Sequence, residues 1–522
     1  MLRFIRENRY IPILIVIVFA FFLRVYQVNK LPPGLYDDEV SLGYNAYSLL
    51  THGTDEYGVR FPLWFKAFGE YKLPGYIYAD IIPIAIFGKN AFAVRFPSII
   101  FGALTPLFLY LFLKNFLSLI PKKTENKFSK IPIISALVLS ITPWHIQFSR
   151  GAYEAVVAVC LYMVGFWLLS VFYKNKKIRY LIISILFFTA SSYTYNLFRI
   201  LTPLTLLVMF FFLLKNMSFP LKIILFLTLY TILINIPLLL FTLSNQGYAR
   251  FQQTTAFSQQ SLPTSRLSNF PIPGLIAYPF IYLKNFLSYF SPQELFIRGE
   301  DNIRFYSSSE FGFLFRWQLP FLIIGLIILL REKFGSLKKI VLWTLFIVPG
   351  LAAITISPNA LRALLLVIPF SIITAIGIQN FMSNKKQWIK IIFAGILLFG
   401  TFETALYFHM YLSHYKNSYT VFWGGAHKEI VEEATGYSEK NYTIVISESL
   451  LANEKIYFLF YNDKLRPLFV DTSWQKPKEW GNRRVLYIRG PAAIPSDKNI
   501  KFLKTITLDT PLKEPIVQLF EL

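Results

Sequence analysis

Three adjacent acids, Asp37, Asp38 and Glu39, stand a few residues after the first long apolar segment of the chain, within LPPGLYDDEVSLGYNAYSLLTHG. Carboxylates at the edge of a bilayer are costly to desolvate, so they usually face water, a cation or a reaction. One of them could act as a general base that takes a proton from an acceptor hydroxyl. The structural alternative is a helix N-terminus, because the backbone dipole favours acids in a first turn. That alternative does not explain three acids beside the membrane, so all three are candidate catalytic residues.

A second group, Glu70 and Lys72, lies in GEYKLPGYIY. A basic side chain at the membrane surface suits the phosphate of a lipid carrier. The alternative is an ordinary lysine whose stem lies along apolar surface with its amine in water.

A third group lies in TPWHIQFSRGAYEA, which holds His145, Arg150 and Glu154. Arg150 and Glu154 are four residues apart, so a plain helical ion pair competes with a substrate-binding role. His145 fits a packed or capping histidine better than a metal ligand. Carboxylates bind hard cations, which leaves a divalent metal open, whereas no His/Cys cluster indicates zinc.

Two further candidates are arginines that could pair with a phosphate through two parallel hydrogen bonds. Arg199 follows Tyr193, Tyr195 and Asn196 in SSYTYNLFRIL, and Arg362 stands in ISPNALRALLLVIP. The tyrosines could equally belong to an aromatic belt, and each arginine could simply anchor a helix. The segment SPQELFIRGEDNIRFYSSSEFGFLFRWQLP could be a lid over a site or packing between outer helices.

The composition is that of an integral membrane protein with many crossings. Of 522 residues, 55% are hydrophobic and 16% are charged, and the mean hydropathy is +0.48. A soluble domain usually carries about 25% charged residues. The net charge of +23 does not indicate nucleic-acid binding, because the basic residues fall in short clusters between apolar segments. The single cysteine, Cys160, excludes an intrachain disulfide.

A spanning helix needs about 20 apolar residues, and about eleven segments qualify or nearly qualify. The N-terminal basic start resembles a signal peptide, but its apolar stretch is long and no small-residue cleavage site follows, so we expect a retained first helix. The predicted spans are 10–28, 94–113, 131–149, 155–173, 180–197, 200–214, 222–241, 318–330, 340–356, 361–381 and 389–410.

Six basic clusters set the orientation. All fall on one side if the first helix runs from inside to outside, and the cytoplasmic side of a membrane protein is the positive one. Their members are Arg3, Arg6, Arg9; Lys114, Lys122, Lys123, Lys127, Lys130; Lys174, Lys176, Lys177, Arg179; Lys215, Lys222; Arg331, Lys333, Lys338, Lys339; and Lys385, Lys386, Lys390.

Three long segments then lie on the extracytoplasmic side of the membrane: 29–93, 242–317 and 411–522. All the candidate groups lie on that side as well. This convergence predicts one extracytoplasmic site at the cell membrane. It excludes nucleotide sugars as donors, because those are cytoplasmic, and requires a membrane-carried donor. The apolar segment 75–93 would reverse the orientation if it crossed, so we expect an interfacial helix in the membrane plane that carries Asp80.

The chain changes character after residue 410. Short β-branched and aromatic runs bounded by Gly, Pro, Asn and Asp predict strands, and HKEIVEEATGYSEK predicts a helix. The predicted strands are TIVIS (443–447), IYFLFYN (456–462), RVLYIRG (484–490) and IKFLKTITL (500–508). We therefore expect two domains, a transmembrane domain over 1–410 and a small extracytoplasmic α/β domain over 411–522.

Residues 31–116 resemble the C-type glycosyltransferases, in particular the protein O-mannosyltransferase and aminoarabinose-transferase superfamily. The match rests on Asp38-Glu39, Gly53, Lys72 with Pro74, Phe87-Gly88, and Arg95 with Pro97-Ser98. It continues through TPWHIQFSRGAYEA, TYNLFRILTPL and ISPNALRALLLVIP, and so covers most of residues 1–410.

The resemblance implies a bundle of membrane helices with interfacial helices in the first outer loop. It further implies a polyprenyl-phosphate sugar as donor and an inverting transfer. Asp38 looks like the catalytic base with Glu39 in support, Lys72, Arg199 and Arg362 are phosphate-side candidates, and Glu154 looks like a second outer acid. Two departures matter: Tyr71 separates Glu70 from Lys72, which puts a metal role for Glu70 in doubt, and Asp37 leaves the identity of the base open.

Three alternatives remain at the level of the sequence. A transporter or flippase of lipid-linked sugars would need polar groups spread through helices at mid-membrane, whereas these cluster on one side. A noncatalytic scaffold would tolerate replacement of all three acids. A transferase using an undecaprenyl-diphosphate donor is a close enzymatic alternative. The sugar, the lipid and the acceptor are not specified.

Overall fold

The computed structural model describes residues 10–216, 220–256, 273–300, 311–447, 454–470, 484–490, 501–507, 510, 513 and 515–521. The helices up to residue 300 are α2 (Ile11–Val25), α3 (Asp37–His52), α4 (Pro74–Phe87), α5 (Ala91–Leu117), α6 (Lys122–Lys127), α7 (Ile131–Ile141), α8 (Pro143–Arg150), α9 (Glu154–Asn175), α10 (Ile178–Ser192), α11 (Phe198–Asn216), α12 (Leu221–Leu243), α13 (Asn245–Thr254), α14 (Pro273–Ser288) and the π-helix η2 (Glu294–Arg298).

The later helices are α15 (Gln318–Arg331), α16 (Ser336–Ala352), the 3-10 turn η4 (Leu364–Leu366), α17 (Val367–Met382), α18 (Gln387–Ser413), α19 (Tyr415–Tyr419), the 3-10 turn η5 (Val421–Trp423), α20 (His427–Ser438) and α21 (Glu454–Tyr461). The strands are β1 (Phe65–Ala67), β2 (Glu70–Lys72), β3 (Thr443–Ser447), β4 (Leu468–Val470), β5 (Val485–Arg489), β6 (Lys501–Thr507) and β7 (Pro515–Glu521).

The chain divides into two compact units. One comprises Met1–Tyr26, Leu63–Tyr76 and Pro97–His409, and the other comprises Gln27–Pro62, Ile77–Phe96 and Met410–Leu522. The first is called the helical unit below and the second the mixed unit. The C-terminal residues therefore share a unit with segments 27–62 and 77–96, which the sequence assigned to the transmembrane domain.

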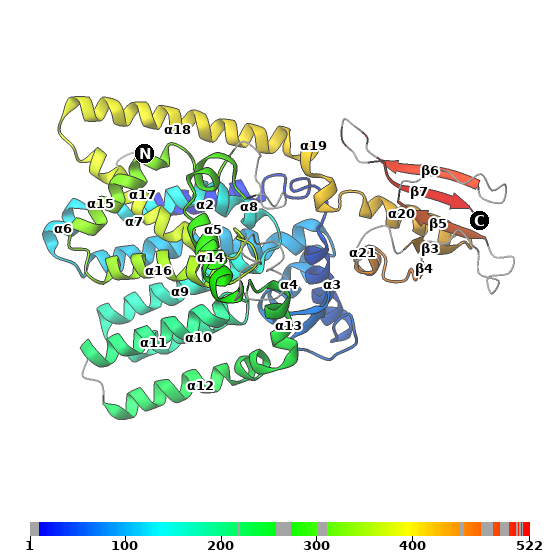
Figure 1. Cartoon of the computed structure of the whole chain (residues 1–522), viewed down its shortest axis with the longest axis horizontal. Helices are drawn as coiled ribbons and strands as arrows, with labels where there is room; N and C mark the ends of the chain where they lie inside the picture. The colour runs from blue at the N-terminus through cyan, green and yellow to red at the C-terminus, as the bar shows by residue number, and fades with distance from the viewer. Residues whose placement is uncertain are drawn as a thin grey trace. The chain divides into compact units, whose positions relative to one another are not determined.

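The helical unit is a bundle in which α9, α10, α11 and α12 lie side by side (Figure 1). Each of the eleven predicted spans contains a helix. Among the described residues, five helices are long and apolar enough to cross a membrane alone, or up to six if a bent pair counts as one. The crossing of the shorter apolar helices stays a prediction.

The predicted continuous span over 131–149 is wrong. The chain forms α7 and α8 instead, bent by 57° at the break. Pro143 begins α8, and a proline inside a helix lacks the N–H donor and its ring clashes with the preceding turn. The span predicted over 361–381 also begins later, since the apolar helix there runs from Leu364 to Met382.

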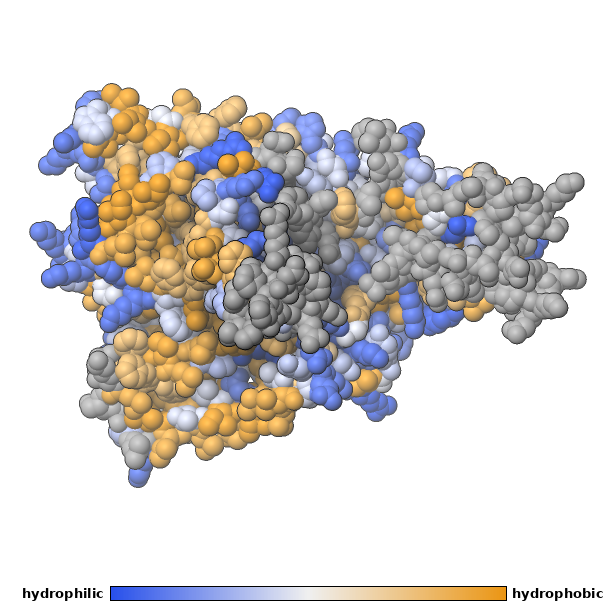
Figure 2. Space-filling model, in the orientation of Figure 1, coloured by the Kyte–Doolittle hydropathy of each residue, from blue (hydrophilic) through white to orange (hydrophobic). Residues whose placement is uncertain are grey.

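Lipid-facing surface accounts for the high apolar content of the chain. Only 11% of an apolar 18-residue stretch of α12 is buried, and only 17% of the corresponding stretch of α18. Leu240 and Leu398 are 65% and 74% exposed. Figure 2 shows apolar side chains over the bundle and hydrophilic ones at the end where α6 lies. A stable fold with so much exposed apolar surface is that of a multi-pass membrane protein.

The mixed unit contains α3 and a five-stranded sheet in the order β4-β3-β5-β7-β6. Strand β3 pairs parallel to β4 and β5, whereas β7 pairs antiparallel to β5 and β6. The core of this sheet joins Ile430 and Ala434 of α20 to Ile446 of β3 and Leu486 of β5. Three predicted strands are confirmed as β3, β5 and β6, and the predicted helix as α20.

The strand predicted over 456–462 is wrong, because this segment forms α21. Ile456, Tyr457, Phe458 and Phe460 are all buried. A short apolar run does not distinguish a strand from a buried helix by its pattern, so packing on several sides decided the outcome.

Candidate functional site

The three acids form the first turn of α3 in the mixed unit, which confirms the helix N-terminus interpretation of their sequence. Glu39 is buried, whereas Asp37 and Asp38 are half-buried. The backbone N–H of Asp38 donates to Asp37 Oδ1 at 2.9 Å, and that of Tyr36 donates to Glu39 Oε2 at 3.1 Å. The acids therefore cap the helix and also present two carboxylates that water can reach.

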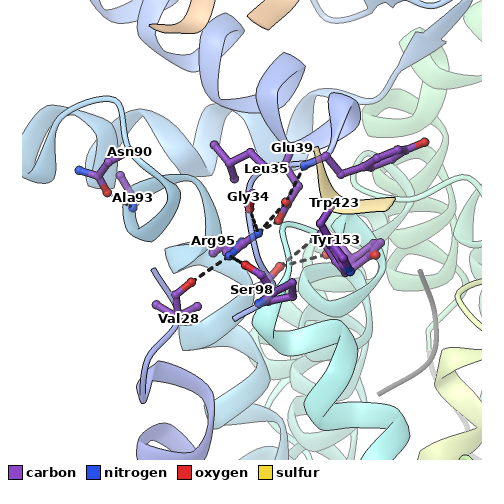
Figure 3. A network of polar contacts seen from close by, with 12 residues as sticks. Val28, Gly34, Leu35, Glu39, Asn90, Ala93, Arg95, Ser98, Tyr153 and Trp423 are labelled. Atoms are coloured by element: carbon purple, nitrogen blue, oxygen red, sulfur yellow. Dashed lines mark hydrogen bonds and ion pairs between the residues drawn. The ribbon is translucent and has the colours of Figure 1, made fainter. Parts of the chain in front are cut away.

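Arg95, near the start of α5, holds Glu39 with two parallel hydrogen bonds (Figure 3). Nε and Nη2 of Arg95 each lie 2.9 Å from a carboxylate oxygen of Glu39. The two side chains are 0% and 1% exposed. A buried charge needs such a partner, because removing one member leaves the other desolvated and uncompensated.

Arg95 also fixes the chain that leads into the acids. Its Nη1 donates to the carbonyls of Val28 and Pro32 at 2.8 and 2.9 Å, and its Nη2 donates to that of Gly34 at 2.6 Å. We call residues 32–39 the acidic turn. One buried guanidinium thus sets both the path of this turn and the position of Glu39, whereas Asp37 and Asp38 are only half-buried.

The helical unit holds a cavity of ≈ 290 Å³ lined by Tyr195, Arg199 and Arg362. Arg199 Nε donates to Thr242 Oγ1 at 3.2 Å, and its Nη1 donates to Asn196 Oδ1 at 3.1 Å. Its guanidinium also lies 5.1 Å from the ring centre of Phe241. The structure thus brings together three of the predicted substrate-binding residues, and two arginines in one partly apolar cavity can bind an anionic group attached to an apolar tail.

Arg362 precedes η4 rather than starting a long helix, and its backbone N–H donates to Asn359 Oδ1 at 3.2 Å. Tyr193, Tyr195 and Asn196 lie between α10 and α11, so they belong to a connection and not to the end of a span. Tyr195 is 7% exposed. A loop held in this way can place its side chains at the cavity wall without the geometric limits of a helix.

Glu70 and Lys72 lie on strand β2 of a two-stranded hairpin, where Lys72 pairs with Phe65. Lys72 is 5% exposed, and its Nζ lies 5.6 Å from the ring centre of Phe68. The hairpin is joined to α13 because Gln253 Nε2 donates to the carbonyl of Gly69 at 3.2 Å. Helix α13 also lines the arginine cavity. A buried lysine here is not the snorkelling side chain of the alternative interpretation.

Arg150 and Glu154 are not on one helix, because α8 ends at Arg150 and α9 begins at Glu154. The simple helical ion pair therefore does not apply. Arg150 Nη1 and Nη2 donate to the carbonyls of Leu23 and Tyr26, each at 2.8 Å. An arginine so placed satisfies the carbonyls at the C-terminus of α2.

His145 is fully buried, and its Nδ1 lies 2.7 Å from Nη2 of the buried Arg24. This is the contact of a packed histidine. Within the described ranges, no three His, Cys, Asp or Glu residues gather in a way that could hold a metal ion. Residues 301–310 of the segment discussed as a lid lie outside the described residues.

Sequence reasoning missed the role of Arg95 and every contribution from the C-terminal segment. Arg95 could have been found, because an arginine in an apolar stretch must have a buried partner. Two residues of the C-terminal segment carry no such signal: Tyr457, whose hydroxyl donates to the carbonyl of Leu35 in the acidic turn, and His427, whose ring stacks on Tyr457. A tyrosine and a histidine are unremarkable in a small α/β domain.

No protein-family model and no curated protein matches the sequence. Solved structures do match. The structure of ArnT from Cupriavidus metallidurans bound to undecaprenyl phosphate has a TM-score of 0.55 at 10% identity, covering 98% of this chain and 97% of that one. The archaeal oligosaccharyltransferase AglB from Archaeoglobus fulgidus, in complex with an inhibitory peptide and a dolichol-phosphate, has a TM-score of 0.50 at 13% identity, covering 92% and 70%.

A second structure of the Archaeoglobus fulgidus oligosaccharyltransferase, tethered to an acceptor peptide, gives a TM-score of 0.53 at 13% identity. It covers 90% of this chain, and this chain spans 64% of it. At sequence identities this low, the structural matches establish the fold alone. This fold is the one that the resemblance implied. The chain has the fold of the C-type membrane glycosyltransferases.

Proposed function

We propose that this protein transfers a sugar from a polyprenyl-phosphate donor to an acceptor hydroxyl on the extracytoplasmic side of the cell membrane. The observation that carries the proposal is the match over nearly the whole length of both chains to ArnT bound to undecaprenyl phosphate. AglB, crystallised with a dolichol-phosphate, supports the same class of donor.

The arginine cavity supports a site for the phosphate of the donor. Arg199 and Arg362 supply positive charge, and Tyr195 supplies a hydroxyl. Charge-assisted hydrogen bonds from guanidinium groups contribute about 1.5–3 kcal/mol each. The largely apolar remainder of the wall suits the first isoprene units of the lipid.

The reaction is a displacement at the anomeric carbon. Asp38, or Asp37, takes the proton of the acceptor hydroxyl. The oxygen then forms a bond to the anomeric carbon as the bond from that carbon to the phosphate oxygen breaks. The polyprenyl phosphate leaves with the electron pair, the configuration inverts, and cationic groups stabilise the charge that grows on the phosphate.

Mass spectrometry of lipid that co-purifies with the protein tests the donor class. We expect a polyprenyl monophosphate hexose or pentose. Arg199→Gln should weaken the binding of undecaprenyl phosphate about tenfold or more. Arg179→Gln is the matched control, since Arg179 is an exposed arginine outside the cavity. Equal affinity in the two variants would argue against this phosphate site.

Replacement of the base tests the reaction. Release of undecaprenyl phosphate from a panel of its hexose and pentose phosphodiesters is measured in membranes that contain native acceptors. Asp38→Asn should reduce release to background while leaving the affinity for undecaprenyl phosphate unchanged, and Asp37→Asn decides between the two aspartates. Normal release with both aspartates replaced would remove the central claim.

A transporter or flippase of lipid-linked sugars is not favoured, because the matched folds are those of transferases. Its distinguishing outcome is movement of undecaprenyl-phosphate sugar across vesicles without consumption of the sugar ester.

A further inference from the structure

The acidic turn is held from a second side by the C-terminal segment of the mixed unit. The hydroxyl of Tyr457, on α21, donates to the carbonyl of Leu35 at 3.2 Å. Helix α21 also packs on α3: a Cβ on Gly43 would lie 2.9 Å from Cε2 of Phe460. Leu35 is only two residues before Asp37, so this hydrogen bond fixes the backbone just ahead of the first acid.

The loop Trp423–His427 packs directly on the same turn. Gly424 has a φ of +64°, and a Cβ there would lie 2.7 Å from Leu35 O and 2.9 Å from the hydroxyl of Tyr457. In the acidic turn opposite this loop, a Cβ on Gly34 would lie 2.5 Å from Trp423 O. Two backbones meet so closely that only glycine fits on either side.

His427 supports Tyr457. The two rings are stacked with centres 3.8 Å apart and planes 14° from parallel. His427 Nδ1 lies 3.1 Å from Gly424 O, which ties the ring to the loop. The indole N–H of Trp423 donates to the hydroxyl of Tyr415 at 3.0 Å, which anchors the other end of the loop.

The acids and Tyr457 are also coupled by charge. Burial, and after it the negative charge of Asp37, raise the pKa of the Tyr457 hydroxyl far above its usual value. Glu39 and Asp38 act in the same direction. The hydroxyl therefore keeps its proton at every working pH and remains a donor to Leu35.

We propose that Tyr457 and the loop Trp423–His427 are positioning elements of the reaction site, which orient the first turn of α3 and so aim Asp38 at the acceptor. Arg95 holds the turn from within segment 27–96, and the C-terminal segment holds it from the other side. The C-terminal segment is then an integral part of the catalytic machinery rather than an appended domain. This inference rests on the proposed function, because it assumes that Asp38 or Asp37 is the base.

Tyr457→Phe tests the hydrogen bond. It removes one hydroxyl and keeps the ring stacked on His427. We expect kcat for release of undecaprenyl phosphate to fall about three- to tenfold, the usual worth of one hydrogen bond, with KM nearly unchanged. Tyr442→Phe is the matched control, because the Tyr442 hydroxyl donates to Glu521 Oε1 at 2.7 Å in the same segment.

The two variants should lose similar thermal stability, since each loses one hydrogen bond. Only Tyr457→Phe should lose kcat, and neither should change the affinity for undecaprenyl phosphate. Equal kcat in the two variants would overturn the inference.

Gly424→Ala tests the close packing. The added methyl should displace Leu35 and lower kcat by more than Tyr457→Phe does. Gly436→Ala is its control, since a Cβ at Gly436 meets nothing within 4 Å. Full activity of Gly424→Ala would also overturn the inference.

The two proposals fail in distinguishable ways. If the Asp37 and Asp38 variants remain active, the proposed reaction fails. If the essential aspartate variant is inactive while Tyr457→Phe behaves like Tyr442→Phe, only the positioning role fails.

Discussion

Arg95 and Glu39 show how much a single buried ion pair can determine. The guanidinium reaches both carboxylate oxygens and three backbone carbonyls, so no smaller cation can replace it. Lysine has one ammonium group and lacks the planar fork that makes two parallel bonds. The pair therefore acts on the backbone of the acidic turn as much as on charge.

Glu39→Gln should destabilise the protein strongly. It removes the carboxylate charge from a fully buried ion pair with Arg95, which costs about 3–5 kcal/mol. The control is Glu432→Gln, because Glu432 pairs with Lys428 at 3.6 Å with both side chains about two-thirds exposed, and such pairs contribute about 0–1 kcal/mol. Thermal unfolding in detergent measures both. A similar melting temperature for the two variants would contradict the role given to the buried pair.

The stability of the mixed unit should depend on His427 in acid. Burial lowers the pKa of His427 from 6.5 to about 4 in the folded protein, against a smaller opposing effect from its bond to Gly424. Folding thus favours the neutral ring. The contribution of His427 to the free energy of unfolding is therefore complete above pH 6.5 and is lost as the pH falls toward 4. The residues that face it are Tyr457, whose hydroxyl is protonated, and the carbonyl of Gly424.

Comparison with His427→Gln, which does not titrate, isolates this effect. The difference in melting temperature between wild type and variant should shrink as the pH is lowered from 6.5 to 4. A difference that stays constant over this range would show that the ring is already charged or already exposed.

At the scale of elements, α15 and α17 approach so closely that glycine is required on both. A Cβ on Gly325 would overlap the carbonyl of Ile373, and one on Gly377 would overlap that of Phe321. Small residues that allow helix backbones to touch are a common way to join membrane helices, because packing replaces the missing hydrophobic drive.

Gly325→Ala should therefore destabilise the helical unit by about 1–3 kcal/mol, the usual cost of overpacking. Gly395→Ala in α18 is the control, since nothing lies within 4 Å of its Cβ. There the higher helix propensity of alanine should leave stability unchanged or raise it by up to about 1 kcal/mol. Denaturation measures both changes when it is followed by the fraction of protein that still elutes as a single monodisperse peak in size-exclusion chromatography.

The elements that could be predicted from sequence are those whose residue pattern is compatible with only one type of secondary structure. Long apolar segments such as 222–241 and 389–410 can only be helices in a bilayer, and TIVIS and RVLYIRG are short β-branched or aromatic runs between turn residues. The break at Pro143 was missed although the proline is itself a local signal for the end of a helix. The helix over 456–462 was missed because a short apolar run has the same pattern in a strand and in a buried helix.

The candidate site was predictable in part for the same reason. Charged residues in apolar surroundings are conspicuous, and Arg199 and Arg362 do share one cavity. The acidic triplet was found, but its division into a buried anchor, Glu39, and two accessible aspartates follows only from the contact with Arg95. The role that we propose for Tyr457 depends on its contact with Leu35, which no local sequence pattern indicates.

At the scale of the whole molecule, the basic clusters predict which side of the membrane each loop faces. The lone cysteine, Cys160, is buried, so single introduced cysteines report on topology without interference. Val59 is 52% exposed, and Lys123 is exposed on α6. They stand on opposite sides in the predicted orientation.

Val59→Cys should react with a membrane-impermeant maleimide in intact cells, whereas Lys123→Cys should react only after permeabilisation. The unsubstituted chain should remain unlabelled in both conditions. Labelling of Lys123→Cys from outside would reverse the orientation and place the acidic turn in the cytosol, which would remove the extracytoplasmic site.

The bond between Tyr457 and Leu35 joins residues 422 positions apart. A ribosome adds about 5–20 residues per second, so a nascent chain waits ~20–80 s between making these two partners. During that interval the acidic turn has its arginine but not its second support. Under the proposed mechanism, a newly made molecule would therefore reach its full rate only after its final segment has folded on the acidic turn, and a product cut short by premature termination or proteolysis would keep this turn held by Arg95 alone.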